Sequence, residues 1–176
     1  MWKNFAFILF LSIISIALQS DYKVLTLEKC YGDNKSVIIE TCNFFDGYLF
    51  NNKMKIIQPI NFMMFKLSIF KKDSNNEFRE LFKNIPTLNW CKIMDGTSKL
   101  TSNFLVKIII LVVKEKFPEI YKRCPLGPGI VDKVNTTIDR RVVVMFPTGI
   151  YRINVAWINK GGDLMFNFLA LLEIFN

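Results

Sequence analysis

Four cysteines and the absence of histidine limit the chemistry that this chain can carry out. Cysteine thiols form disulfides, bind zinc or act as nucleophiles, and nucleophilic catalysis by serine or cysteine usually relies on a histidine base. Because the chain has neither histidine nor a C-x-x-C pair, a zinc site is disfavoured. An even number of cysteines in a short exported chain is typical of a disulfide framework. The sequence therefore predicts two disulfides among four residues: Cys30, Cys42, Cys91 and Cys124.

The other candidates for catalysis are carboxylates and one glycine-rich stretch. Asp132 and Asp139 flank a predicted loop with no sign of burial. The G-P-G stretch at 127–129 is interpreted as a turn and not as a phosphate loop, because its proline lacks an N–H donor and no basic residue stands at the required offset. No G-x-S-x-G or dinucleotide-binding motif is present. The sequence thus predicts a protein that is not an enzyme and holds no cofactor or metal.

Export is predicted from residues 1–20. Lys3 provides a positive charge, residues 5–16 form an apolar run, and small residues precede cleavage after Ala17 or Ser20. The run is shorter than the roughly 20 apolar residues that a membrane-spanning helix needs. The segment is therefore interpreted as a cleaved signal peptide, with an uncleaved anchor as the alternative. The protein is predicted to be secreted and extracellular.

The part that follows, residues 21–176, is long enough for a single domain with one core. Two N-x-S/T sequons predict glycosylation and exposure at Asn34 and Asn135. Without Lys3, 22 basic side chains stand against 15 acidic ones, but the basic residues are dispersed in runs no longer than a pair. This pattern favours a solvated surface, and nucleic acid is not a predicted partner. The oligomeric state is not indicated.

Short apolar segments recur at roughly ten-residue spacing, which is typical of a β-sandwich or barrel. The predicted strands are 24–29, 37–45, 48–57, 61–70, 141–145, 150–159 and 164–175, with short apolar pieces at 78–82 and 85–90. Turn residues at 31–34 separate the first two strands, and the Gly-Gly pair at 161–162 predicts a hairpin between the last two.

Residues 104–113 are predicted to form a helix packed against the sheet. Their β-branched side chains favour a strand, but the apolar positions recur at the helical interval. Thr101 or Ser102 can cap the start, and Pro118 closes the end. Four cysteines allow three pairings, among which the sequence does not choose. We prefer Cys91 with Cys124, which would tie this helix to the sheet. A tight turn at 31–34 would set the other pair out of register.

Several pieces of the chain resemble, in order and spacing, a family of small secreted arthropod proteins that includes the class A and class B chemosensory (gustatory) proteins. That family is itself similar to the ganglioside-activator branch of the ML lipid-recognition superfamily. The pieces that carry the resemblance are Cys30 with Cys42, the strand 66–72 ending in a basic pair, L-N-W-C at 88–91, R-C-P at 123–125, and the P-x-G-x-Y strand from Pro147 to Trp157. The resemblance covers the chain from about Lys29 onward.

The resemblance implies a mainly β fold, an ML/immunoglobulin-like sandwich of two antiparallel sheets with one short helix. It also implies an apolar cavity between the sheets for one lipid or lipid-like molecule. The candidate cavity residues are Phe62, Phe65, Phe104, Ile108, Tyr151, Trp157, Phe166 and Phe168. For any one of them, a place in a solid core is the alternative. Tyr151 and Trp157 have the same phase and are predicted to point to one face of their strand.

Two functions remain open. In the first, the protein is a secreted binding protein for a small hydrophobic or lipid-like ligand, with chemosensation (pheromone or taste detection) implied by some family members and a membrane surface or a receptor as further partners. In the alternative, it is a secreted structural or protein-interaction module with a solid core and no small ligand. A continuous apolar cavity favours the first function, and a solid core with an exposed apolar patch favours the second.

Overall fold

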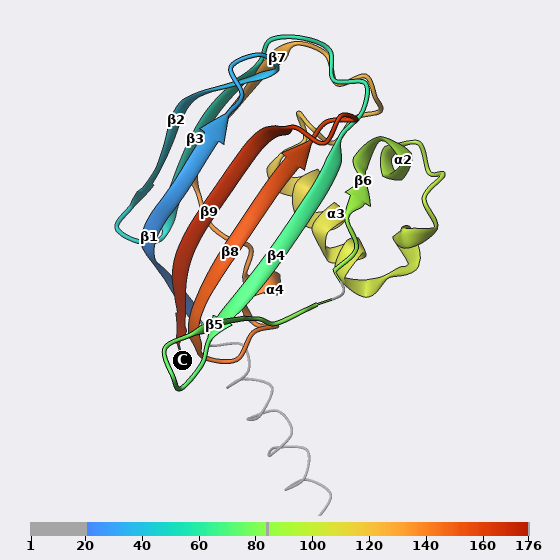
Figure 1. The fold of residues 1–176 in the computed structure, drawn as a ribbon. Helices are drawn as coiled ribbons and strands as arrows, with labels where there is room; N and C mark the ends of the chain where they lie inside the picture. The colour runs from blue at the N-terminus through green and yellow to red at the C-terminus, as the bar shows by residue number, and fades with distance from the viewer. Residues whose placement is uncertain (1–20, 84, 176) are drawn as a thin grey trace, which may run out of the picture.

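The computed structural model describes residues 21–83 and 85–175. Within them, nine strands form two antiparallel sheets accompanied by a few short helices (Figure 1). The predicted mainly β class with two antiparallel sheets is thereby confirmed. The predicted signal peptide, residues 1–20, lies outside the described residues.

The larger sheet has six strands in the order β1-β9-β8-β4-β5, with β6 pairing one end of β4. These strands are β1 (Asp21–Gly32), β4 (Met64–Lys72), β5 (Phe78–Glu80), β6 (Leu88–Asn89), β8 (Gly149–Ile158) and β9 (Leu164–Phe175). The predicted hairpin between β8 and β9 is confirmed. Asn159 N donates to Asp163 O at 2.9 Å, and Gly162 takes the positive φ of 91° that glycine accommodates without strain.

The smaller sheet has three strands in the order β2-β3-β7. They are β2 (Val37–Phe45), β3 (Leu49–Ile56) and β7 (Gly129–Thr136), and they form a second layer at the upper left of Figure 1. The tight turn between β2 and β3 contains Asp46 and Gly47, both with positive φ. Positive φ at two central residues is the turn conformation that matches the twist of a β-hairpin. Gly47 O accepts a 2.7 Å hydrogen bond from Val24 N, so this hairpin is attached to β1 of the larger sheet.

The predicted helix at 104–113 is confirmed as α3 (Phe104–Lys116). Its cap is Asn103 rather than Thr101 or Ser102, because those two residues belong to a preceding 3-10 turn, η1 (Lys99–Ser102). The Asn103 side chain accepts hydrogen bonds from the backbone N–H groups of Leu105 and Val106. Two shorter helices, α2 (Trp90–Met94) and α4 (Arg140–Val143), complete the set in the described residues.

One strand prediction was wrong, and one strand was not predicted. Residues 141–145 do not form a strand, because the Asp139 side chain caps α4 by accepting from Arg141 N at 2.9 Å, and a helical turn then runs through Val143. The strand β7 was missed altogether. It is an edge strand in which Val131 is buried but Ile130 and Val134 are exposed, so its apolar residues do not follow the alternation that marks a half-buried strand.

Both disulfides are present, Cys30–Cys42 and Cys91–Cys124. The objection that a tight turn would set the first pair out of register was wrong, because β1 and β2 are not ladder partners. β1 pairs with β9 and β2 pairs with β3, so Cys30–Cys42 joins the two sheets. The second bridge ties α2, not α3, to the segment that follows α3.

Candidate functional site

An apolar pocket of about 310 Å³ is the main candidate site. The buried apolar side chains form two clusters, one around Trp90 and Trp157 and the other around Tyr22 and Tyr151. Members of both clusters line the pocket, and they come from both sheets and from the helices. The pocket therefore occupies the space between two separately packed parts of the core.

The sheets supply two of its walls, which we call the sheet walls. On each strand every second side chain points to the same face, so the lining residues alternate along the chain. In the larger sheet they are Val24 of β1, Phe65, Leu67 and Ile69 of β4, Ile153, Val155 and Trp157 of β8, and Phe166, Phe168, Ala170 and Leu172 of β9. In the smaller sheet they are Phe44 of β2, Phe50, Asn52 and Met54 of β3, and Thr136 of β7.

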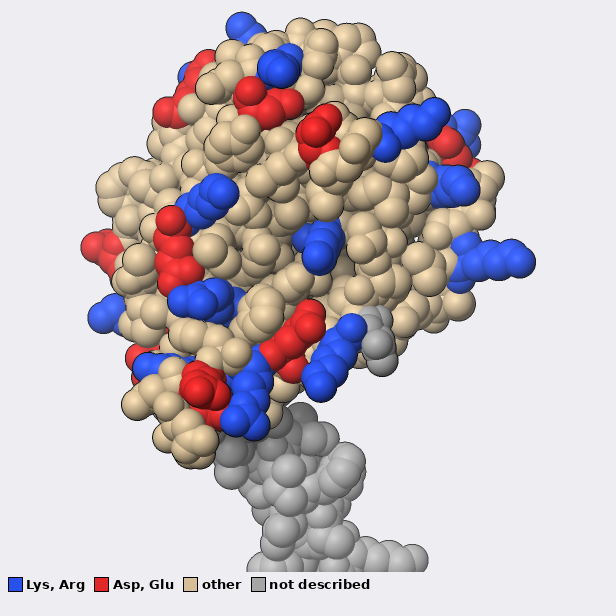
Figure 2. Space-filling model, viewed as in Figure 1, with Lys and Arg blue, Asp and Glu red and all other residues tan. Residues whose placement is uncertain are grey.

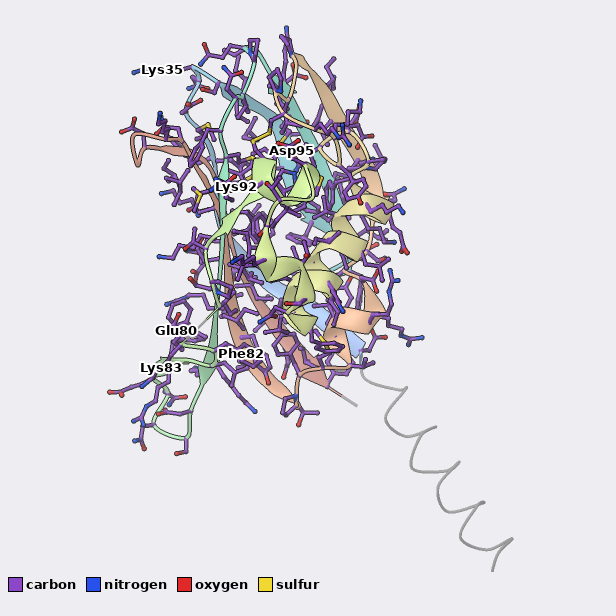
Figure 3. All side chains as sticks on the ribbon, turned by 90° about the vertical axis from the view of Figure 1, so that its right-hand side faces the viewer. Lys35, Glu80, Phe82, Lys83, Lys92 and Asp95 are labelled. Carbon is purple, nitrogen blue, oxygen red and sulfur yellow. A yellow bond between two sulfur atoms is a disulfide. The ribbon has the colours of Figure 1, made fainter. Side chains whose placement is uncertain are left out.

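A third wall comes from residues 90–120, which we call the helical wall. These residues face the reader in Figure 3. The lining residues of α3 recur at the helical interval and are Leu105, Ile108, Ile109, Val112, Val113 and Lys116. Phe117 and Ile120 extend the lining beyond α3, and Trp90 of α2 lies beside them. Trp90 is fixed by its indole N–H, which donates to Ile120 O at 3.1 Å.

Five of the eight predicted cavity residues line this pocket. They are Phe65, Ile108, Trp157, Phe166 and Phe168. Trp157 and Phe166 are cross-strand partners on β8 and β9, and their ring centroids lie 4.9 Å apart. The larger sheet and α3 thus bring together residues from three distant parts of the sequence.

The other three predicted residues lie elsewhere. Phe104 is 68% exposed because it stands at the outer side of the first turn of α3. Tyr151 is buried on the same face of β8 as Trp157, but it packs against Phe146, and its hydroxyl donates to Pro147 O. Phe62 is half-buried before β4, where its neighbour Met63 reaches the pocket instead.

Sequence reasoning missed the lining that the smaller sheet provides. Phe44 and Phe50 pack at 4.9 Å between centroids, and Phe50 meets Phe168 of the other sheet at 5.3 Å. Asn52 and Met54 continue the same face of β3. Phe50 and Met54 lie four residues apart on one face of the strand, but the three residues between them are all polar, so no apolar alternation is visible.

A polar depression adjoins the pocket and shares four lining residues with it: Lys116, Thr137, Ile138 and Asp139. Next to these residues, the guanidinium of Arg141 donates to Asp139 and to Glu115 in the last turns of α3. These hydrogen bonds lower the pKa of both carboxyl groups, so that both are ionised at neutral pH. The ion pairs attach the end of α3 to α4.

The polar edge of the pocket, which we call the rim, is the segment 136–139 together with Lys116 of α3, and Tyr22 anchors that segment. Its hydroxyl donates to Tyr48 O and accepts from Ile138 N, both at 2.8 Å. Burial raises the pKa of Tyr22, so the phenol stays neutral and can donate at neutral pH. One side chain therefore connects β1, the hairpin between β2 and β3, and the segment that borders the pocket.

The surface charge is mixed. On the face shown in Figure 2, basic and acidic side chains alternate and leave no continuous basic patch. Within residues 21–83 and 85–175, no three His, Cys, Asp or Glu side chains gather in a group able to hold a metal ion. None of the helices in that part of the chain has both the length and the apolar character needed to cross a membrane.

Comparison with known proteins found no family model that matches the chain and no matching curated protein. The resemblance to the chemosensory and ML lipid-recognition proteins therefore stays a prediction that rests on the sequence motifs alone.

Proposed function

We propose that the protein is a secreted binding protein for a small hydrophobic or lipid-like ligand, which it holds between the two sheets of an ML-like β-sandwich. The observation that supports this function is the apolar pocket of about 310 Å³. A cavity of about 150 Å³ holds one benzene molecule, and ligand pockets measure roughly 300–1,000 Å³. The pocket therefore matches a ligand of about a dozen non-hydrogen atoms.

The lining sets the expected affinity. Each buried methylene contributes about 0.8 kcal/mol, so a ten-carbon chain gains roughly 8 kcal/mol before any cost is subtracted. Association costs at least about 4 kcal/mol in lost freedom. Because 8 kcal/mol corresponds to a dissociation constant of about 1 μM, we expect such a chain to bind more weakly than that. Nanomolar affinity would need a longer ligand that also contacts the rim.

Secretion is part of the proposal. Two disulfides fit an oxidising compartment, and both sequon asparagines, Asn34 and Asn135, have exposed side chains that a glycan could occupy. A role in chemosensation, and contact with a membrane surface or a receptor, rest on the resemblance to the chemosensory proteins.

The first test asks whether a ligand accompanies the purified protein. The chain is expressed through the secretory pathway of an oxidising host, and the folded product is analysed by native mass spectrometry and then by solvent extraction with gas chromatography. We expect one apolar molecule per chain, or uptake of one when the protein is offered medium-chain alcohols, fatty acids and hydrocarbons. A chain that stays empty under all of these conditions would contradict the proposal and favour the protein-interaction module.

A pocket-filling variant gives a matched comparison. Val155→Trp places a large side chain into the pocket from β8, and Val134→Trp makes the same change on the outer face of β7, where Val134 is 66% exposed. The first variant should lose ligand binding and the second should retain it, with both proteins folded by circular dichroism. Equal binding by the two variants would show that the ligand sits elsewhere.

A further inference from the structure

Asn52 is a polar exception inside an apolar pocket. Its side chain lines the pocket, the residue is only 4% exposed, and Oδ1 has no hydrogen-bond partner among the described residues. Nearly all buried polar atoms in folded proteins are hydrogen-bonded, and leaving one without a partner costs about 1–3 kcal/mol. An amide in this position therefore calls for a partner that the chain itself does not supply.

The position of Asn52 follows from the strand register. On the two neighbouring strands, its partners are Cys42 of β2 and Lys133 of β7. Cys42 is bonded to Cys30 of the larger sheet, so the face of β2 that carries Cys42 looks toward that sheet. Asn52 lies on the same inner face, next to the disulfide that joins the sheets and between the side chains of Phe50 and Met54.

The remaining polar lining residues are at the rim. They are Lys116, Thr136, Thr137 and Asp139, and all but Thr136 also line the polar depression outside. Thr136 is the partner of Phe50 across the β3 and β7 ladder, whereas Asn52 lies further along β3, toward Met54. The amide is therefore the polar group that a ligand meets after it has passed the rim.

We infer that Asn52 selects a ligand that carries a hydroxyl group, so that the preferred ligand class is a medium-chain alcohol or a similar neutral amphiphile with its hydroxyl inside the pocket. This inference rests on the proposed function. A hydroxyl both donates and accepts, so it suits the amide in either orientation of its oxygen and nitrogen. A hydrocarbon leaves the amide without a partner. An anionic headgroup at this depth loses its hydration, and the ammonium of the neighbouring Lys133 is already paired with Glu119.

A water molecule is a weaker partner for this amide. Buried waters typically make about three hydrogen bonds to polar groups. The neighbouring lining residues Phe50 and Met54 have apolar side chains, and the cross-strand partner Lys133 is already paired with Glu119. A hydroxyl attached to an alkyl chain is retained by the burial of the chain as well as by the hydrogen bond. Asn52 therefore distinguishes between ligands of equal size.

The test compares two ligands and two variants. The ligands are 1-decanol and undecane, which have the same number of non-hydrogen atoms, and their binding to delipidated protein is measured by headspace gas chromatography. Asn52→Leu removes the amide at similar volume. Asn43→Leu makes the same change at the exposed neighbour of Cys42 on β2, a residue that does not line the pocket. We expect Asn52→Leu to weaken 1-decanol binding about fivefold to tenfold and to leave undecane binding unchanged or tighter. Asn43→Leu should change neither.

Thermal unfolding of the delipidated proteins gives a readout that does not depend on a ligand. Asn52→Leu should unfold at the same or a higher temperature than the parent, because it removes a buried amide that lacks a partner. A lower temperature would show that the amide has a structural partner and would overturn the inference. Asn52→Val, which suits a strand, repeats both measurements if the leucine variant does not fold.

The two proposals can fail separately. If the parent protein binds both ligands and Asn52→Leu shifts both by the same factor, the inference about Asn52 is wrong and the proposed function stands. If the parent binds neither ligand, the proposed function fails and the inference fails with it.

Discussion

The sheet walls and the helical wall of the pocket are held in place by different kinds of interaction. β8 and β9 are hydrogen-bonded to each other along their whole length, and Cys30–Cys42 joins the larger sheet to the smaller one. The helical wall begins directly after β6 and contains no strand, so no strand ladder connects it to either sheet. It is held by Cys91–Cys124, by the hydrogen bond from Trp90 N to Met63 O, by the packing of its buried side chains into the core, and by a few polar contacts at its end.

This difference indicates which part of the pocket can open. A ladder opens only when several backbone hydrogen bonds break together, whereas a helix that packs through side chains can move as a unit. One of the polar contacts is the ion pair between Lys133 Nζ and Glu119 Oε1 at 2.7 Å, and another is the pair between Arg141 and Glu115. We therefore expect a ligand to enter where α3 of the helical wall separates from the segment 136–139, while the sheets keep their shape.

The largest effect is expected from removing the disulfide of the helical wall. Cys91→Ser with Cys124→Ser opens a link with a sequence separation of 33, for which chain entropy predicts a loss of about 4 kcal/mol in the free energy of unfolding. The same double variant should release a bound ligand faster, because the wall loses the disulfide that ties its first helix to the segment after α3. Denaturant unfolding measures the first effect, and stopped-flow displacement of a fluorescent fatty acid analogue measures the second.

The matched control is Cys30→Ser with Cys42→Ser. This link has a sequence separation of 12, and chain entropy predicts a loss of about 3 kcal/mol. The ligand release rate should change less than in the first double variant, because hydrogen bonds still hold the strands of each sheet. Faster release from this control than from the first variant would reverse the assignment of the mobile wall.

A smaller effect is expected at the turn between β1 and β2, which carries the chain from one sheet to the other. The Asp33 carboxylate accepts hydrogen bonds from the backbone N–H groups of Lys35, Ser36 and Val37 at 3.0, 2.7 and 2.9 Å. Burial opposes ionisation of this group, but the three donors outweigh it and lower the pKa of Asp33 on balance. Asp33→Ala should lower the free energy of unfolding by about 1–2 kcal/mol at neutral pH.

The pH dependence of that difference follows from the sign of the shift. Because the folded pKa lies below the unfolded value of 3.8, the stabilisation is fully present above about pH 4. It is lost as the pH falls through the folded pKa. Urea unfolding of the parent and of Asp33→Ala at several pH values should therefore converge in acid, and a gap that stays constant down to pH 2 would show that the carboxylate charge is not involved.

The smallest effect on stability is expected at the rim. Arg141→Met removes the ion pairs to Glu115 and Asp139. The Arg141 and Glu115 side chains are 45% and 46% exposed, and Asp139 keeps its hydrogen bond from the backbone N–H of residue 141, so the free energy of unfolding should change little. Hydrogen exchange at the end of α3, residues 113–117, should nevertheless become faster, because the helix loses its attachment to α4. Arg140→Met alters a neighbouring exposed arginine outside these ion pairs and should leave exchange unchanged. Equal exchange in the two variants would show that other contacts hold the helix end.

Local pattern predicted most of the elements of this fold. The strands at 37–45 and 164–175 were predicted with the bounds that the structure has, because apolar alternation and turn residues act over short distances. The helix at 104–113 was predicted against its β-branched composition by the spacing of its apolar residues. The errors at 141–145 and 129–136 arose where local pattern was weak. A side-chain cap made the first segment helical, and pairing with β3 made the second a strand.

The pocket was predicted less completely than the elements. Phe65, Trp157 and Phe168 were found because large apolar residues stand on one face of predicted strands. Phe44 and Phe50 were missed because nothing in the sequence indicates which face of the smaller sheet meets the larger one. Asn52 was missed for the same reason, since a single asparagine in a polar stretch is typical of an exposed strand position.

The sequence by itself determined the cysteine framework, the strand and helix segments with clear periodicity, and the mixed character of the surface charge. These properties depend on residue type and on neighbours a few positions away. The tertiary structure decided that β1 and β2 belong to different sheets, that Cys30–Cys42 crosses between them, and that α3 lines the pocket. Such features depend on contacts between residues far apart in the chain, whose register and facing side chains are set only when the sheets and helices pack together.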